Sequence, residues 1–127
     1  MSGKKTTVLI ADNEDSIRHL IGEMLGKRFI VLEARNGIES MEVSYMHNPD
    51  IILMDMFMPI KDGHITCSKL QSDERTREIP LVAISGEGGL LEEKLVLAMG
   101  AKGFLSRPFT KQKLKAVLSP LVKAAWA

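Results

Sequence analysis

Five short apolar segments recur along the chain, and most are continuous rather than alternating with polar residues. They cover residues 8–11, 29–32, 51–54, 81–84 and 103–105. A continuous apolar run of this length is typical of a strand that is covered on both faces, as in a parallel sheet between two layers of helices. The pattern therefore predicts five buried strands.

The stretches between these segments have the spacing of helices. Three apolar stripes with the helical repeat lie at Ile17–Leu25, at Leu91, Leu95 and Ala98, and at Leu114–Val122. Residues 38–46 and 65–70 are predicted as helices mainly because they lie between strands. Strands that alternate with helices indicate an α/β fold of the doubly wound (βα)5 type. Such a fold is a five-stranded parallel sheet with helices on both faces and right-handed crossovers.

Capping and turn residues mark the ends of the predicted helices. Asp62 and Thr110 are candidates for N-caps, and Gly100 for the glycine that ends the fourth helix. Pro120 falls inside the last apolar stripe. Because proline in a helix interior costs about 3 kcal/mol, we expect it to kink that helix or to end it near Ser119.

Composition and charge narrow the class of protein. The chain has 127 residues, of which 45% are hydrophobic and 26% charged, so we expect one globular domain spanning residues 1–127. This composition excludes an intrinsically disordered chain. The 17 basic and 16 acidic residues leave a formal net charge of +1, which gives no basic surplus for binding nucleic acid.

The cysteine content and the longest apolar run indicate the compartment. Cys67 is the single cysteine, so no internal disulfide can form and a reducing compartment is expected. No apolar run approaches the roughly 18 residues of a membrane span. The best candidate, residues 51–60, is interrupted by Asp55. We therefore expect a cytoplasmic protein with no membrane partner.

Polar side chains follow the predicted strands in a regular way. Asp12 comes directly after the first strand, Asp55 after the third and Ser85 after the fourth, and Arg107 lies just beyond the fifth. In an open parallel sheet, ligands bind at the carboxyl ends of the strands, where the strand order reverses. Asp12 and Asp55 would meet at one edge if the first and third strands are neighbours. Taken alone, Asp12 could equally be a loop or helix-capping residue.

Asp55 is the strongest single candidate for chemistry. It follows Ile51–Met54 and precedes Met56-Phe57-Met58. A charged residue in such apolar surroundings is rarely buried unless it is paired or bound to a metal. Two or three oxygen ligands at one edge suit Mg²⁺, and a carboxylate beside that ion can attack phosphorus to give an aspartyl phosphate. Ser85 and Arg107 supply the hydroxyl and the fixed cation that such a transfer requires.

These residues in this order resemble the response-regulator receiver domain of two-component signalling, a family that includes stand-alone chemotaxis regulators. The similarity extends from about Thr6 to Val122. The motifs that carry it are Asp12-Asn13-Glu14-Asp15, Asp55 followed by Met58-Pro59 and Asp62-Gly63, Ser85-Gly86, and Arg107-Pro108-Phe109. The resemblance implies a flavodoxin-like sheet with the strand order 2-1-3-4-5.

The resemblance also implies the chemistry of the site. Asp55 would accept a phosphoryl group from a phosphohistidine on a sensor histidine kinase or phosphotransfer protein. Mg²⁺ would be held by Asp12, Asn13, Asp55 and the backbone carbonyl of Phe57. The protein would catalyse only its own phosphotransfer and dephosphorylation, and so would not be an enzyme in the usual sense.

Further residues match the family's switch and output surface. Ser85 and Phe104 would be the switch residues, Arg107 would contact the phosphoryl group, and the Arg107–Pro108 peptide would be cis. The signal would be presented to a downstream protein, whose identity the sequence does not give. The presenting face would comprise the fourth helix, the fifth strand and the fifth helix, with Leu90–Met99, Phe104, Lys111, Lys113 and Lys115.

Two residues depart from the family pattern. Asn13 stands where a second acidic residue is usual, which lowers the negative charge of the pocket and should weaken Mg²⁺ binding. Arg107 stands where lysine is usual, and its planar fork of donors favours pairing with Asp55 or Asp12. Two hypotheses therefore stay open: a receiver switched by phosphorylation, and a degenerate receiver that acts as an interaction module without it.

Other classes of protein fit less well. A phosphatase of the haloacid-dehalogenase type needs a second carboxylate where Phe57 stands, and a flavodoxin needs a phosphate loop where the acidic residues 12–15 stand. Residues 86–89 are rich in glycine but lack the spacing of a dinucleotide-binding loop. His19, His47 and His64 are scattered without metal-ligand spacing, so we interpret them as surface residues.

Overall fold

A parallel sheet of five strands, in the order β2-β1-β3-β4-β5, forms the centre of the structure. The computed structural model describes residues 5–58, 63–86 and 89–122. The strands are β1 (Thr6–Ala11), β2 (Phe29–Ala34), β3 (Ile51–Asp55), β4 (Leu81–Ser85) and β5 (Gly103–Ser106). The predicted α/β class, strand positions and strand order are confirmed, with each strand one or two residues longer than its apolar run.

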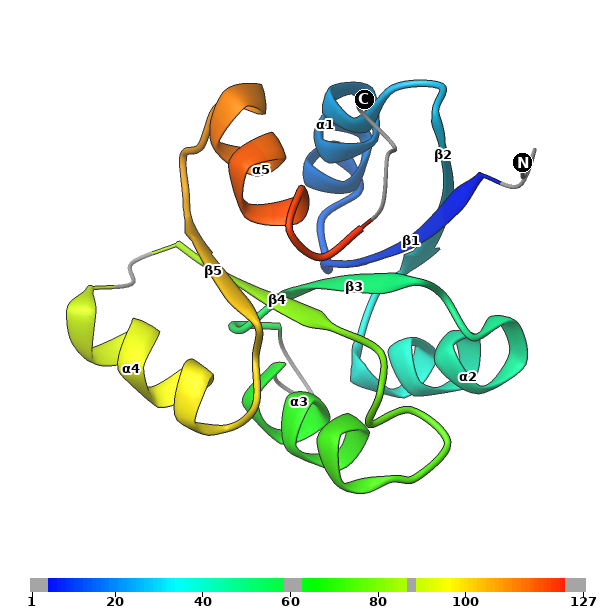
Figure 1. The fold of residues 1–127 in the computed structure, drawn as a ribbon, viewed down its shortest axis with the longest axis vertical. Helices are drawn as coiled ribbons and strands as arrows, with labels where there is room; N and C mark the ends of the chain where they lie inside the picture. Colours follow the sequence, from blue (N-terminus) through cyan, green and yellow to red (C-terminus); the bar gives the residue numbers. More distant parts are fainter. Residues whose placement is uncertain (1–4, 59–62, 87–88, 123–127) are drawn as a thin grey trace.

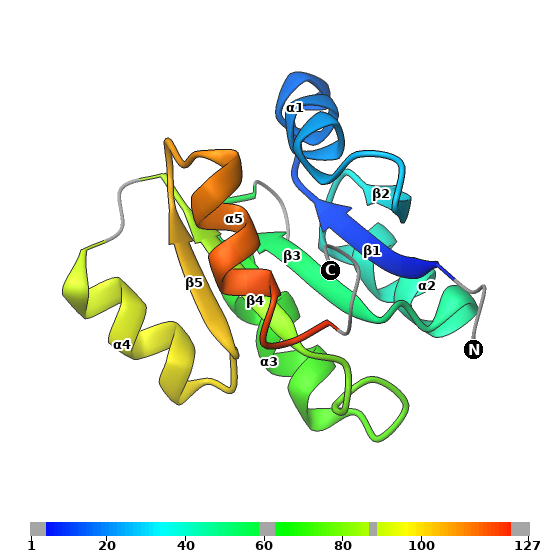
Figure 2. The same ribbon diagram turned by 45° about the horizontal axis from the view of Figure 1, so that its top comes forward.

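Helices cover both faces of this sheet (Figures 1 and 2). They are α1 (Asp15–Leu25), α2 (Gly37–His47), α3 (Gly63–Ser72), α4 (Leu90–Ala98) and α5 (Lys111–Leu118). Helices α1 and α5 lie on one face, and α2, α3 and α4 on the other (Figure 1). Alternate strand residues point into two separate apolar cores, one for each face. None of these helices is long and apolar enough to cross a bilayer.

The ends of the helices follow from their capping residues. The Thr110 side chain accepts a hydrogen bond from the Lys113 amide at 3.1 Å, as predicted for an N-cap. Gly100 has φ of +111°, a conformation that glycine adopts without steric cost, and it follows Met99, the C-cap of α4. Helix α5 ends at Leu118, so the expected effect of Pro120 is confirmed. The predicted cap at Asp62 lies outside the described residues.

The prediction of which side of α4 faces the sheet was wrong. Leu91 and Leu95, which the spacing placed toward the core, are 83% and 49% exposed. Val96 is the buried residue of this helix. The helix is apolar around most of its circumference, so the periodicity alone could not show which side would pack on the sheet. Leu20 of α1 is likewise half-exposed rather than buried.

The register of the sheet brings the polar strand ends together. Ala11 pairs with Met54, so the next residues, Asp12 and Asp55, emerge side by side at the carboxyl edge. On the other side of β3, Asp55 pairs with Ile84, which precedes Ser85. The fold therefore confirms the predicted meeting of the first and third strands at one edge.

Candidate functional site

Asp55 ends the central strand β3 and is 2% exposed. Its Oδ1 accepts a hydrogen bond from the Phe57 amide at 3.0 Å. The Met56 amide donates to the Ile84 carbonyl at 2.9 Å, which extends the ladder between β3 and β4 by one residue. These bonds fix the position and orientation of the carboxylate at the edge of the sheet.

The backbone of Gly63 packs closely against the end of β3. Its amide donates to the Met56 carbonyl at 3.2 Å. A Cβ at this position would lie 2.2 Å from the Asp55 carbonyl oxygen and 2.5 Å from Met56 Cα. Glycine is therefore required here by close approach of the backbone. The motif quoted in the sequence contained Gly63, but the spacing did not reveal this contact.

Asp12 lies beside Asp55 and is 1% exposed. Its Oδ1 accepts a hydrogen bond from the Glu14 amide at 2.9 Å. The pKa of the Asp12 carboxyl is raised to about 6, chiefly by burial and in smaller part by the negative charges of Asp55 and Glu14, against two smaller opposing effects. Those opposing effects are the Glu14 amide and the positive charge of Arg107. A cation bound in this acidic pocket would favour the ionised form of Asp12 and so lower its pKa.

Arg107 extends from the end of β5 to both carboxylates. Its Nη2 lies 3.4 Å from Asp55 Oδ1, and its Nη1 lies 3.7 Å from Asp12 Oδ2. The Arg107 amide donates to the Ser85 carbonyl at 2.8 Å, which anchors the backbone of the residue to β4. The expected pairing of Arg107 with the acidic pocket is confirmed, and so is the cis peptide between Arg107 and Pro108.

The donor set at this edge fits one hard cation with a phosphoryl group. Asp12 Oδ2, Ser85 Oγ and Arg107 Nε are buried and have no hydrogen-bond partner among the residues that the structure describes. Within the described ranges, no three His, Cys, Asp or Glu side chains form a metal cluster. The pocket thus has two carboxylates, and the exposed Asn13 and the Phe57 carbonyl are the further oxygen donors expected from the resemblance. One or two carboxylates with additional oxygen ligands is the usual environment of Mg²⁺.

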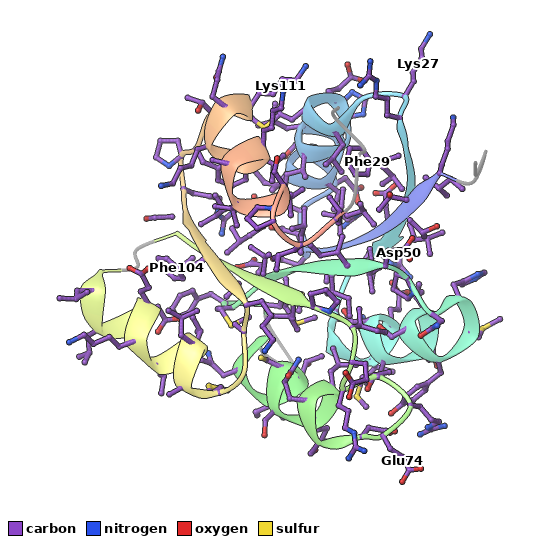
Figure 3. All side chains as sticks on the ribbon, viewed as in Figure 1. Lys27, Phe29, Asp50, Glu74, Phe104 and Lys111 are labelled. Carbon is purple, nitrogen blue, oxygen red and sulfur yellow. The ribbon has the colours of Figure 1, made fainter. Side chains whose placement is uncertain are left out.

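Ser85 and Phe104 lie on neighbouring strands at different depths. Ser85 is fully buried at the end of β4. Phe104 is half-buried and packs against the apolar core on the α4 side, which includes Met56, Met58 and Val96. Figure 3 labels Phe104 where β5 runs past α4. Ser85 therefore lies at the strand end beside the acidic pocket, and Phe104 lies on the α4 side of the sheet.

One buried residue at the site was missed by sequence reasoning. Arg18 of α1 is 6% exposed, and its Nη1 donates to the Asp12 carbonyl at 2.6 Å. Its Nε donates to Glu33 Oε1 at 2.7 Å, and Nη2 pairs with Asp15. Arg18 occurs three residues before Ile21 and seven before Leu25, so the helical repeat already placed it on the buried stripe. It holds the backbone of the loop that follows β1.

A groove adjoins the acidic pocket on the α1 side. It has a volume of about 410 Å³. Side chains of α1 form one wall, and the segment after β5 forms the other; the lining residues are Ile17, Leu20, Ile21, Met24, Gly86, Arg107, Pro108 and Phe109. Because Arg107 belongs to both the groove and the pocket, a partner bound in the groove would lie next to Asp55.

Comparisons with known proteins by sequence profile and by sequence identity point to the same family. The sequence profile of the response regulator receiver domain matches residues 8–119. The chemotaxis protein CheY of Halobacterium salinarum is 32% identical over 120 residues, which cover 92% of this chain and 97% of that protein. The chemotaxis protein CheY1 of Helicobacter pylori is 32% identical over 85% of this chain and 90% of its own length.

Longer relatives and solved structures extend the comparison. The DNA-binding dual master transcriptional regulator RpaA of Synechocystis is 29% identical, and the match covers 91% of this chain but only 48% of that protein. A putative response regulator from Chloroflexus aurantiacus superposes with a TM-score of 0.83 at 26% identity, over 91% of this chain and 98% of that one. The CheY4 protein of Vibrio cholerae has the same fold, with a TM-score of 0.86 at 23% identity, over 94% of this chain and all of that one.

Proposed function

Because the chain belongs to the family of response regulator receiver domains, we propose that Asp55 accepts a phosphoryl group from a phosphohistidine and that the phosphorylated chain signals to a downstream protein. The single observation that carries this proposal is the position of Asp55. It is a buried carboxylate at the end of the central strand, with Asp12, Ser85 and Arg107 around it. Burying a charged carboxylate costs free energy, and a carboxylate held in this way can act as a nucleophile in covalent catalysis.

The transfer is a single displacement at phosphorus. Oδ1 of Asp55 is engaged by the Phe57 amide and by Arg107, so Oδ2 is the nucleophile. A new O–P bond forms at Asp55 while the P–N bond to the donor imidazole breaks. The leaving imidazole nitrogen takes up a proton. Water then hydrolyses the acyl phosphate and returns Asp55 to its carboxylate form.

Three groups of the chain act on the transferred phosphoryl group. Arg107 supplies a permanent positive charge to its equatorial oxygens, and Ser85 supplies a hydroxyl donor from the adjacent strand. Bound Mg²⁺, held by Asp12, Asn13, Asp55 and the Phe57 carbonyl, would supply further neutralisation of charge. With two carboxylates in the pocket and Arg107 already beside them, we expect this metal binding to be weak.

The groove beside Arg107 is suited to the phosphodonor protein. A phosphohistidine on a folded partner must come within bonding distance of Asp55, so the partner has to cover the adjacent surface. The half-exposed Leu20 and the other apolar side chains of the groove, together with Phe109, offer that surface. A sensor histidine kinase or a phosphotransfer protein would dock there with an apolar helix face.

The output surface is proposed on α4, β5 and α5. Leu90 and Leu91 are 68% and 83% exposed, and the lysines 111, 113 and 115 are exposed on α5. A rearrangement of Ser85 toward the phosphoryl group would open space for Phe104, and Phe104 packs on the α4 side. Movement of these two residues would therefore change the surface that a cytoplasmic target reads.

Phosphorylation of the purified protein tests this proposal. The protein is incubated with acetyl phosphate or phosphoramidate, with and without Mg²⁺, and intact masses are recorded. The expected result is a mass increase of one phosphoryl group that is removed by hydroxylamine, as an acyl phosphate should be. Asp55→Asn should abolish it, whereas Asp50→Asn, at the opposite end of β3, should not (Figure 3). Absence of any Asp55-dependent gain would favour an interaction module that works without phosphorylation.

A further inference from the structure

His64 connects the segment after the phosphoacceptor strand to helix α4. It is the second residue of α3, and its ring contacts Phe57 edge-to-face, with ring centroids 5.6 Å apart and planes at 75°. Its Nε2 lies 2.9 Å from Oε2 of Glu92 on α4. The two side chains are 23% and 16% exposed, so this is a partly buried hydrogen bond rather than a solvated surface pair.

The Phe57 end of this connection is rigidly joined to the acidic pocket. The Phe57 amide donates to Asp55 Oδ1, and the Met56 carbonyl accepts from the Gly63 amide next to His64. A displacement of the Phe57 backbone would therefore move both the Asp55 carboxylate and the ring that packs on His64.

The Glu92 end lies on a helix with little apolar attachment. Val96 is the buried residue of α4, while Leu90, Leu91, Leu95 and Leu97 are all more than 40% exposed. When apolar burial is small, one hydrogen bond between partly buried groups accounts for a larger share of what holds the helix in place. The bond to His64 is therefore well placed to influence the position and stability of α4.

We propose that His64 is a positioning residue that couples the Phe57 segment to α4 through Glu92. The coupling rests on the proposed function, because the Phe57 carbonyl is one of the oxygens expected to hold Mg²⁺ beside Asp55. It is separate from the Ser85–Phe104 connection, which runs through β4 and β5. Since coupling between two sites is reciprocal, a target that binds α4 and displaces Glu92 would change the affinity of the acidic pocket for its cation.

The first experiment uses the full chain without any ligand. Amide hydrogen exchange and amide chemical shifts are measured by NMR for the wild type, His64→Leu, Glu92→Leu and Glu92→Gln. His64→Leu and Glu92→Leu should accelerate exchange in α4 by about five- to tenfold, and Glu92→Leu should shift the Phe57 amide. Glu92→Gln keeps an oxygen acceptor, so its exchange rates in α4 and its Phe57 amide shift should both stay close to the wild-type values.

His19→Leu is the matched control, because His19 also faces a glutamate but is 79% exposed on α1, away from α4. It should leave α4 and Phe57 unchanged. A Phe57 amide in Glu92→Leu that is identical to the wild type would overturn the proposal. So would wild-type exchange rates throughout α4 in His64→Leu.

The second experiment adds Mg²⁺ and beryllium fluoride, a stable mimic of the phosphoryl group on a carboxylate. In the wild type, the amides of Phe57, Ser85 and α4 should shift. In His64→Leu and Glu92→Leu the Ser85 shift should persist while the shifts in α4 fall to less than about half. Undiminished α4 shifts in both variants would contradict the coupling. A wild-type protein with no shift at Phe57 or Ser85 would contradict the proposed function instead, and the ligand-free result would still decide whether His64 joins the two elements.

Discussion

Arg107 and Asp55 meet across the sheet edge, with Nη2 3.4 Å from Oδ1, although they are 52 residues apart in the sequence. The same guanidinium lies 3.7 Å from Asp12. A permanent cation thus occupies the space between two buried carboxylates, in a pocket where Asn13 replaces the acidic residue usual in the family. The two departures from the family pattern are therefore electrostatically linked, because the arginine offsets charge that a metal ion would otherwise neutralise.

Asn13→Asp is expected to tighten Mg²⁺ binding about tenfold or more, because a third carboxylate interacts with the cation by several kcal/mol at an effective dielectric near 20. The measurement is isothermal titration calorimetry of Mg²⁺ into metal-free protein. Asn48→Asp, which adds the same charge before the opposite end of β3, is the control and should leave the affinity unchanged. Equal affinities for the wild type and Asn13→Asp would show that Asn13 is a neutral substitution.

Arg107→Lys is expected to alter phosphotransfer more than stability. A lysine ammonium is a single point charge that can pair with one carboxylate at a time, so Mg²⁺ should compete for the pocket more easily. The Mg²⁺ concentration that half-saturates phosphorylation by acetyl phosphate should fall about threefold or more. The free energy of unfolding in urea should change by less than about 1 kcal/mol, since the ion pair is partly exposed. A large loss of stability with unchanged kinetics would assign Arg107 a structural role.

Asp12 should make the protein less stable as the pH rises. Its pKa is about 6 in the folded chain, against 3.8 for the unfolded reference, so the folded state holds an extra proton between these values. Stability is therefore lost as the pH increases from about 4 to about 6, by about 2–3 kcal/mol, and is constant above that range. Asp12→Asn removes this titration.

Urea unfolding of both proteins in metal-free buffer measures the effect. The variant should match the wild type near pH 4 and exceed its free energy of unfolding by about 2–3 kcal/mol at pH 7. A difference between the two proteins that does not depend on pH would mean that the ionised Asp12 is not destabilising.

Gly63→Ala should destabilise the protein by about 2–3 kcal/mol or more, because the added methyl group cannot fit against the backbone of Asp55 and Met56 without moving it. Mg²⁺ binding should weaken as well, since the displaced backbone carries the Phe57 carbonyl. Gly22→Ala, in α1, is the control, because in the described part of the chain no atom outside the helix's own backbone lies within 4 Å of the added carbon. It should stabilise the helix by about 0.5–1 kcal/mol. Thermal unfolding followed by circular dichroism compares the two variants.

The sequence by itself determined the architecture and the composition of the candidate site. Buried parallel strands have continuous apolar runs, and the polar residue that ends each run, such as Asp55 or Ser85, must emerge at the carboxyl edge of the sheet. These are local properties of the chain, so they can be predicted without knowing what packs against what. The same holds for the end of α5 before Pro120 and for the cap at Thr110.

The tertiary structure alone decided the contacts between elements. Leu91 and Val96 are both apolar residues of one helix, and only the placement of α4 against the sheet buries Val96 and exposes Leu91. The bond between His64 and Glu92 joins two helices separated by β4, and the backbone contact of Gly63 with Asp55 depends on how α3 returns to the sheet. Sequence periodicity describes one element at a time. The relative placement of two elements depends on packing distances that no local pattern encodes.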